Sequence, residues 1–145
     1  MTAAGGRAKG ELHCRVLTPE KNVYDDFVDS AVLATAAGEL EVFPRFEPTV
    51  SPLAVGVMRA KGGDGSVAEV AIHGGYLDMN GKSLLILADS AEMGGEINVE
   101  RARRALARAR QQLAEASEKA EAAEVDRARL ALLRALTRLR AAGAE

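Results

Sequence analysis

The sequence predicts a mixed fold in which an N-terminal antiparallel β-sandwich is followed by a C-terminal α-helical tail. Three observations indicate this division. Short apolar stretches alternate with Gly, Pro, Asn and Asp clusters over residues 11–93, which is typical of antiparallel sandwiches and barrels. Residues 98–142 contain neither Gly nor Pro and are rich in Ala, Leu, Arg and Glu, which favour helices. Between the two parts, Gly94 and Gly95 begin a linker, residues 94–97.

Turn-forming residues divide the predicted sandwich into short strands. Residues 62–65 read Gly-Gly-Asp-Gly, which tolerates positive φ and predicts a hairpin loop. Asn80-Gly81 predicts a second hairpin turn, of type I′. The expected strands are residues 12–17, 22–24, 28–35, 39–43, 56–60, 67–73, 76–80 and 83–87.

Two apolar stripes run along the tail, each with alternating spacings of three and four residues. They consist of Val99, Ala102, Leu106, Ala109 and Leu113, and of Val125, Ala128, Leu132, Ala135 and Leu139. Residues 115–124, between the stripes, are charged and Ala-rich but hold no helix breaker. The tail is therefore predicted to be either an α-helical hairpin or one extended helix of about 65 to 70 Å. Because Ala buries less apolar surface than Leu, a hairpin closed on these stripes should open easily.

The net charge of −2 conceals an acidic body and a basic tail. Residues 1–95 carry 8 basic and 13 acidic side chains, whereas residues 96–145 carry 11 and 8. No uniform field is offered to nucleic acid or anionic lipid, and no apolar run could span a bilayer, so we expect neither nucleic-acid binding nor direct membrane insertion. The single cysteine, Cys14, indicates a reducing compartment. Residues 1–10 are Ala/Gly-rich and are expected to be a disordered leader.

No catalytic or metal-binding constellation is expected from the few nucleophilic and ligating residues. The sequence has two histidines, His13 and His73, and one cysteine, Cys14. His13 and Cys14 are adjacent on a predicted strand, which directs them to opposite faces. His73 precedes Gly74-Gly75, a pattern that favours a strand bend over a catalytic loop. These observations predict a structural or binding protein, not an enzyme.

Arginines are the most distinctive polar feature of the tail. Arg101 and Arg108 are two helical turns apart on one face, and Arg134 and Arg138 are one turn apart. One interpretation is a solvated face with i,i+4 partners. The other is a polyanion site, because guanidinium groups bind phosphates bidentately. Interspersed acidic residues argue against DNA as that polyanion.

Several short motifs resemble, in order, those of the epsilon subunits of F-type ATP synthases. They are Leu17-Thr18-Pro19-Glu20, Gly38-Glu39-Leu40 with Phe43-Pro44, Pro52-Leu53 with Gly56, Gly74-Gly75-Tyr76-Leu77, Leu87-Ala88-Asp89-Ser90-Ala91-Glu92 and Ile97-Asn98-Val99-Glu100-Arg101-Ala102. The resemblance extends over residues 11–140. It implies a non-catalytic central-stalk (rotor) subunit, held as a peripheral protein on the cytoplasmic face of the inner membrane during proton-driven ATP synthesis.

The resemblance also implies partners. In the family the sandwich binds the gamma subunit and rests on the c-ring, while the extended tail meets the alpha/beta catalytic hexamer and restrains ATP hydrolysis. Glu39 matches a family carboxylate at the c-ring loops, and Phe46 lies in the neighbouring segment of the expected c-ring interface. That segment, residues 45–49, reads Arg-Phe-Glu-Pro-Thr where the family usually has Gly-His-Ala-Pro-Leu.

Some bacterial members bind regulatory ATP in the folded tail, through an Ile/Leu-Asp-x-x-Arg-Ala motif, an upstream Glu and later arginines. The matching residues here are Glu92, Arg101, Ala102, Arg108, Arg134 and Arg138. Asn98 replaces the aspartate, and as Asn it remains a good helix N-cap. The resemblance thus implies regulatory ATP and no required cofactor. The alternative function is a free-standing adaptor or polyanion-binding module with a basic coiled-coil tail.

Overall fold

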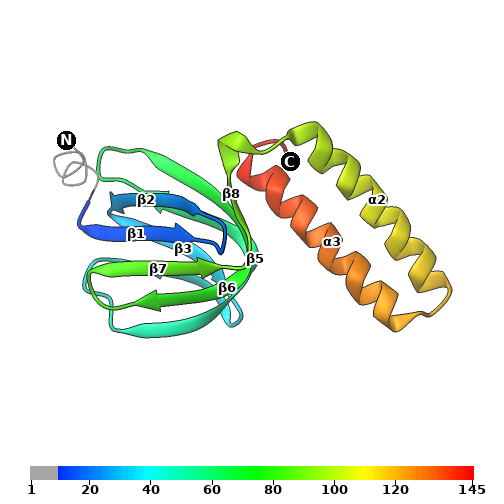
Figure 1. Cartoon of the computed structure of the whole chain (residues 1–145), viewed down its shortest axis with the longest axis horizontal. Helices are drawn as coiled ribbons and strands as arrows, with labels where there is room; N and C mark the ends of the chain where they lie inside the picture. The colour runs from blue at the N-terminus through cyan, green and yellow to red at the C-terminus, as the bar shows by residue number, and fades with distance from the viewer. Residues whose placement is uncertain (1–9) are drawn as a thin grey trace.

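The computed structural model describes residues 10–145, so the predicted leader, residues 1–10, lies outside the described residues apart from Gly10. A β-sheet body occupies one end of the molecule, and a helical hairpin projects from the other (Figure 1). The fold class predicted from the sequence is confirmed. The strands are β1 (Leu12–Leu17), β2 (Asn22–Val28), β3 (Ser30–Thr35), β4 (Gly38–Val42), β5 (Thr49–Lys61), β6 (Val67–Met79), β7 (Ser83–Ala88) and β8 (Ala91–Met93). They are followed by a 3₁₀ turn, η1 (Gly94–Glu96), and by the helices α2 (Val99–Glu118) and α3 (Ala122–Ala141).

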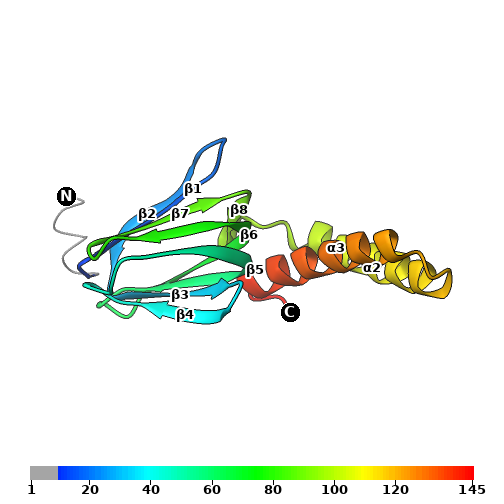
Figure 2. The ribbon, with the colours of Figure 1, turned by 90° about the horizontal axis from the view of Figure 1, so that it is seen from below.

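The strands pair in the order β2-β1-β7-β6-β5-β3-β4, and β8 adds to the first half of β6. Figure 2 shows how this sheet folds into two layers, with β1, β2 and β7 in one and β3 and β4 in the other. β1 and β7 pair in parallel, unlike the predicted antiparallel arrangement, while the other pairs of described strands are antiparallel. No tight turn joins β1 to β7, so the antiparallel constraint of a hairpin does not apply to them.

The core between the layers follows from alternation along the strands. Cys14 and Val16 of β1 are fully buried and lie beside Leu84 and Ile86 of β7. Leu77 of β6 continues the row, since it pairs with Ile86. Because side chains alternate between faces, the residues between these positions point outward.

Several details of the sheet differ from the sequence predictions. β6 is continuous, where two strands ending and starting around Gly74-Gly75 were expected; both glycines have positive φ, +85° and +123°. β5 extends back to Thr49 and includes Pro52, and β8 was not predicted. The turn after β6 has positive φ at Gly81 but not at Asn80 or Lys82, so it lacks the two consecutive positive φ values of the predicted type I′ turn; Asn80 Oδ1 accepts the backbone N–H groups of Lys82 and Ser83.

The tail is a closed hairpin, one of the two conformations that the sequence left open. α2 ends in a Schellman motif, in which Glu121 N–H bonds to Ala116 C=O and Ala120 N–H bonds to Ser117 C=O. Ala120 occupies the left-handed position with φ +56°, where glycine is usual. The chain therefore reverses direction without a Gly, Pro or Asn residue, the types that usually form such a turn.

Alanines form the seam between the two helices, as the stripes predicted. Ala102, Ala109 and Ala116 of α2 are buried, as are Ala128 and Ala135 of α3. The larger residues of the stripes are half-buried at the borders of the seam, apart from buried Leu139.

The hairpin meets the body at its base, while its tip lies far from the sheet in both views (Figures 1 and 2). A second apolar cluster forms this joint, with Ala71 of β6 under Leu139 and Ala141 of α3, and with Ile97 alongside. Gly94 lies so close to the end of α3 that a Cβ there would be 2.1 Å from Ala141 O.

Candidate functional site

A pocket of about 690 Å³ opens at the base of the hairpin, within the size range of small-ligand sites. Four arginines and two glutamates carry its charge. Its lining consists of Glu92, Glu96, Ile97, Asn98, Arg101, Ala102, Arg104, Ala105, Arg108 and Arg138. The first turns of α2 supply half of this lining, the segment just before α2 supplies Glu96, Ile97 and Asn98, β8 supplies Glu92, and the last turn of α3 supplies Arg138.

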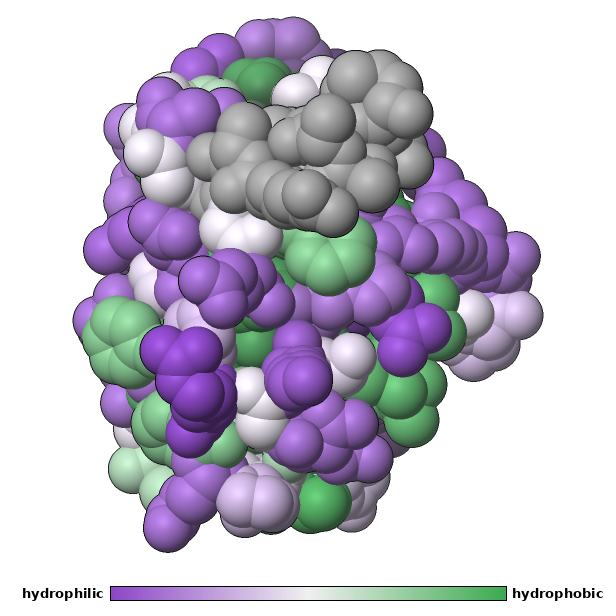
Figure 3. Space-filling view, turned by 90° about the vertical axis from the view of Figure 1, so that its left-hand side faces the viewer, coloured by the Kyte–Doolittle hydropathy of each residue, from purple (hydrophilic) through white to green (hydrophobic). Residues whose placement is uncertain are grey.

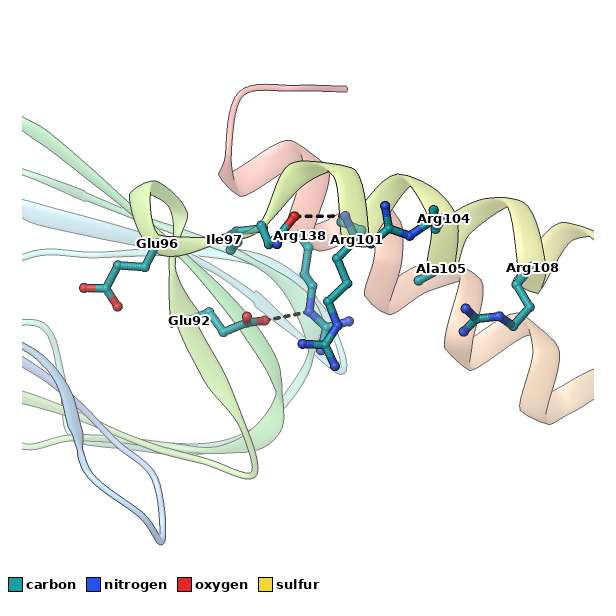
Figure 4. Close-up of a pocket in the computed structure, with 10 residues that line it drawn as sticks. Glu92, Glu96, Ile97, Arg101, Arg104, Ala105, Arg108 and Arg138 are labelled. Carbon is teal, nitrogen blue, oxygen red and sulfur yellow. Dashed lines mark hydrogen bonds and ion pairs between the residues drawn. The ribbon is translucent and has the colours of Figure 1, made fainter.

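The start of α2 positions the arginines. Asn98 caps the helix, because its Oδ1 accepts a hydrogen bond from the Arg101 backbone N–H at 3.0 Å. Figure 4 shows the side chains of Arg101 and Arg108 directed to the same side of α2, whereas Glu96 points away from them. In the described part of the chain, Arg101, Arg104 and Arg108 have no acidic partner within ion-pair distance. These three exposed guanidinium groups are free to bind an anion.

Arg138 is already paired in this conformation. Its Nε donates to Glu92 Oε1 at 2.6 Å, joining α3 to β8 (Figure 4). The same carboxylate oxygen lies 3.5 Å from Nε2 of His73, whose side chain is only 2% exposed. Burial lowers the pKa of His73, the nearby Arg138 and Arg134 lower it further, and Glu92 opposes them.

Six of the seven residues proposed for nucleotide binding line this one pocket. They are Glu92, Asn98, Arg101, Ala102, Arg108 and Arg138. Arg134 lies one turn before Arg138 on α3 but is not part of the lining. The structure thus brings these positions together, and the binding of a nucleotide to them stays a prediction.

Comparisons with known proteins match both parts of the chain. Residues 11–94 match the family model "ATP synthase, Delta/Epsilon chain, beta-sandwich domain", and residues 96–143 match "ATP synthase, Delta/Epsilon chain, long alpha-helix domain". The chain belongs to the ATP synthase delta/epsilon chain family. The resemblance seen in the sequence motifs is therefore confirmed.

Two curated relatives illustrate how much of the chain this family likeness covers. An ATP synthase epsilon chain of Halalkalibacterium halodurans is 43% identical over 72% of this chain and 77% of its own length. One from Gloeobacter violaceus is 39% identical over 92% of this chain and 98% of its own length. Among solved structures, the mitochondrial ATP synthase of Euglena gracilis contains a chain with a TM-score of 0.75 and 23% identity, covering 93% of this chain and 81% of that one. This structural likeness shows the shared fold.

The two residues expected at a c-ring interface lie at different places on the delta/epsilon-type sandwich. Glu39 is exposed near the start of β4, beside the β3–β4 turn. Phe46 follows the far end of β4 and packs, half-buried, against the body core. Arg45, just before it, has φ +66° and donates its backbone N–H to Gly81 O. The structure therefore does not join Glu39 and Phe46 into one local patch.

An apolar row crosses the outer face of the body on four neighbouring strands. The strand registers place Leu17, Leu87, Tyr76 and Pro52 side by side, from β1 through β7 and β6 to β5. Tyr76 is 58% exposed and Leu87 50%. At the end of the body opposite the hairpin, by contrast, hydrophobic residues are scattered among hydrophilic ones (Figure 3). An apolar row whose central residues are exposed in this way is typical of an interface.

Sequence reasoning missed three features of the site. Glu96 and Arg104 line the pocket but match no motif residue, and His73 was considered only as part of a strand bend. The pairing of β8 with β6 brings Glu92 close to His73, and the docking of α3 brings Arg138 close to it. Neither contact has a local sequence signal. The spacing of Arg101 and Arg104, one turn apart on α2, was the available clue for Arg104.

Proposed function

We propose that this chain is the non-catalytic central-stalk subunit of a rotary ATP synthase, and that its hairpin restrains ATP hydrolysis when it leaves the body. Membership of the delta/epsilon chain family supports the first part. The second part, the restraint of hydrolysis, rests on how the hairpin is attached. It is held at its base by a small apolar cluster around Ala71 and Leu139 and by the Glu92–Arg138 ion pair. A tail held by so few contacts can detach and refold as a unit.

The body supplies two candidate docking surfaces. The apolar row of Leu17, Leu87, Tyr76 and Pro52 suits a stable contact with the gamma subunit, because burying it would remove exposed apolar area from water. The exposed β3–β4 turn with Glu39 suits a polar contact with the loops of the c-ring. One subunit would thus couple gamma to the c-ring during proton-driven synthesis, and its extended tail would reach the alpha/beta hexamer.

Location follows from these partners. None of the helices in residues 10–145 is long and apolar enough to cross a membrane. We place the chain at the cytoplasmic face of the cell membrane, held there as a peripheral protein by gamma and the c-ring.

The pocket at the hairpin base suits regulatory ATP. Three unpaired arginines on one helix can bind the phosphates, and the pocket volume of about 690 Å³ admits a nucleotide. Bound ATP would bridge α2 to the end of α3 and favour the closed hairpin, since a ligand stabilises the state that it binds. A nucleotide would then release the restraint on hydrolysis.

Truncation tests the proposed restraint. A chain ending at Glu96 keeps β8 and the whole core cluster of the body but lacks both helices. In the assembled enzyme, we expect this variant to raise the rate of ATP hydrolysis, measured against the full chain, while gamma and the c-ring still co-purify with it. Unchanged hydrolysis in a fully assembled complex would refute the restraint, and loss of gamma would refute the proposed role of the body.

A further inference from the structure

A buried histidine lies under the joint between the body and the hairpin. His73 is on the outward face of β6, two residues after Ala71, which packs beneath Leu139 and Ala141 of α3. Its register partner on β5 is Val55, and its backbone N–H donates to Ser90 O at 2.9 Å. The side chain is 2% exposed, so the docked hairpin and the adjoining strands exclude it from water.

The imidazole makes no hydrogen bond within the described residues. Both ring nitrogens are buried without a partner in hydrogen-bond geometry. Glu92 Oε1, from β8, is 3.5 Å from Nε2 but is already bonded to Arg138 Nε at 2.6 Å. A buried polar group without a hydrogen bond destabilises the folded state, so a change in its protonation can change the stability of the interface that buries it.

The charged groups around His73 are mainly cationic on the hairpin side. α3 contributes Arg138 and Arg134, both close enough to disfavour a charged imidazole. β8 contributes the one opposing carboxylate, Glu92, and β5 presents the apolar Val55. The carboxylate of Asp89, in the β7–β8 turn, lies against Gly74, the residue that follows His73 on β6.

We propose that His73 makes the attachment of the hairpin proton-sensitive, so that protonation of its imidazole releases the base of α3 from the body. A protonated imidazole, itself buried, would place a third positive charge beside Arg138 and Arg134, with Glu92 shared among them. Release of α3 hydrates His73 and separates it from both arginines. This device needs no bound nucleotide and goes beyond the proposed restraint of hydrolysis.

The sign of the pH dependence follows from linkage. In the docked state the pKa of His73 lies below its ordinary value, because of burial and the two arginines. In the released state the imidazole is hydrated and its pKa returns toward about 6.5. The released state therefore binds more protons, so docking is fully stable above about pH 6.5 and weakens as the pH falls toward the lower pKa of the docked state.

Histidine NMR on the full chain tests the first half of this proposal. The sequence has two histidines, and the imidazole signal that disappears in a His73→Gln variant is assigned to His73. Leu139→Arg places a charge in the joint and supplies the undocked reference, whereas Leu130→Arg alters an exposed position of the same helix. We expect the pKa of His73 to rise in Leu139→Arg and to stay at the wild-type value in Leu130→Arg. Equal His73 titrations in all three chains would overturn the proposal.

Energy transfer between two dyes measures release itself. Lys82→Cys and Ala114→Cys provide exposed sites on the body and on α2. Cys14 stays unlabelled, because it is fully buried and burial raises the pKa of its thiol to about 12. From about pH 8 to about pH 5.5 we expect the released fraction to rise in the wild-type background and to stay constant with His73→Gln. The docking constant should change by no more than the ratio of the two His73 acid dissociation constants that NMR gives.

If His73→Gln does not fold, a second variant, Arg138→Gln, still tests the proposal. Arg138→Gln removes a repelling charge and frees Glu92, so the pKa of His73 should rise and the pH response should shrink. A released fraction that does not change with pH, or an undiminished response in either variant, would overturn the proposal. Because these assays use the isolated chain, their failure is distinct from a failure of the proposed restraint of hydrolysis.

Discussion

Arg108 and Arg110 lie two residues apart on α2, yet the pocket includes only Arg108. Both are exposed, carry the same charge and occur in the same stretch of helix. If the pocket binds ATP, Arg108→Ala should weaken binding about tenfold or more, because a hydrogen bond from a charged donor contributes about 1.5 to 3 kcal/mol. Arg110→Ala should change the affinity little. Isothermal calorimetry on the isolated chain measures both, and equal losses would indicate long-range attraction in place of a defined site.

Single residues of the site were predictable to the extent that their roles are local. The N-cap at Asn98 follows from residue type and position, and the structure confirms it with the bond to Arg101 N–H. Arg138 was predicted to serve a nucleotide, but here it bonds to Glu92, 46 residues earlier. That contact depends on how α3 docks. Spacing within a helix predicts which residues share a face, and it does not give the partner across the joint.

Ala120 decides whether the two helices form a hairpin or one long helix. In the hairpin it has φ +56°, which costs a non-glycine residue about 1 kcal/mol or more. In a continuous helix the same position is interior, where Gly is about 1 kcal/mol worse than Ala. Ala120→Gly should therefore favour the hairpin by about 2 kcal/mol, or about 30-fold in the equilibrium.

Spin labels on α2 and α3 measure this balance as the population of short and long distances. Ala114→Gly is the matched control, because residue 114 is exposed and helical in both conformations. It should weaken the helix without shifting the balance. An equal shift from both substitutions would show that the left-handed residue is not what limits hairpin closure.

The elements with a clear local pattern were predicted well, and those set by distant pairing were not. β1 has the predicted bounds, because Leu12, Cys14 and Val16 alternate with outward residues. β6 runs through Gly74-Gly75 because its register with β5 continues on both sides of them, which no local propensity indicates. The choice of hairpin over long helix likewise depends on the alanine seam and on one strained residue, Ala120.

At the scale of the whole molecule, an acidic body and a basic tail meet at a joint that is small for the parts it connects. The body has its own core cluster, with no residue shared with the cluster at the joint. The opposite charges of the body and the tail favour docking. Among the described residues, Glu92 and Arg138 form the one direct ion pair that joins the body to the hairpin. Because that pair is about one-third exposed, its contribution is modest, and packing at the base of α3 carries much of the attachment.

Gly94 is the point at which this packing is tightest. Its backbone φ is not in the left-handed region, so an alanine there is strained by contacts and not by conformation. A Cβ would lie 2.1 Å from Ala141 O and 3.2 Å from Glu69 O, and both neighbours are backbone atoms that cannot move without shifting an element. Gly94→Ala should therefore separate the end of α3 from β6 while leaving the core of the body intact.

Gly95 provides the control, since a Cβ added there meets nothing within 4 Å. In the Gly94→Ala chain, we expect the backbone amide signals of Ala71 and of the end of α3 to shift and the signals of the inner strands to remain. The Gly95→Ala spectrum should match that of the wild type. In the assembled enzyme, Gly94→Ala should also lower ATP hydrolysis, because a released hairpin extends more readily. If Gly94→Ala leaves the joint signals unchanged, or if Gly95→Ala disturbs them equally, the close approach at Gly94 does not govern docking.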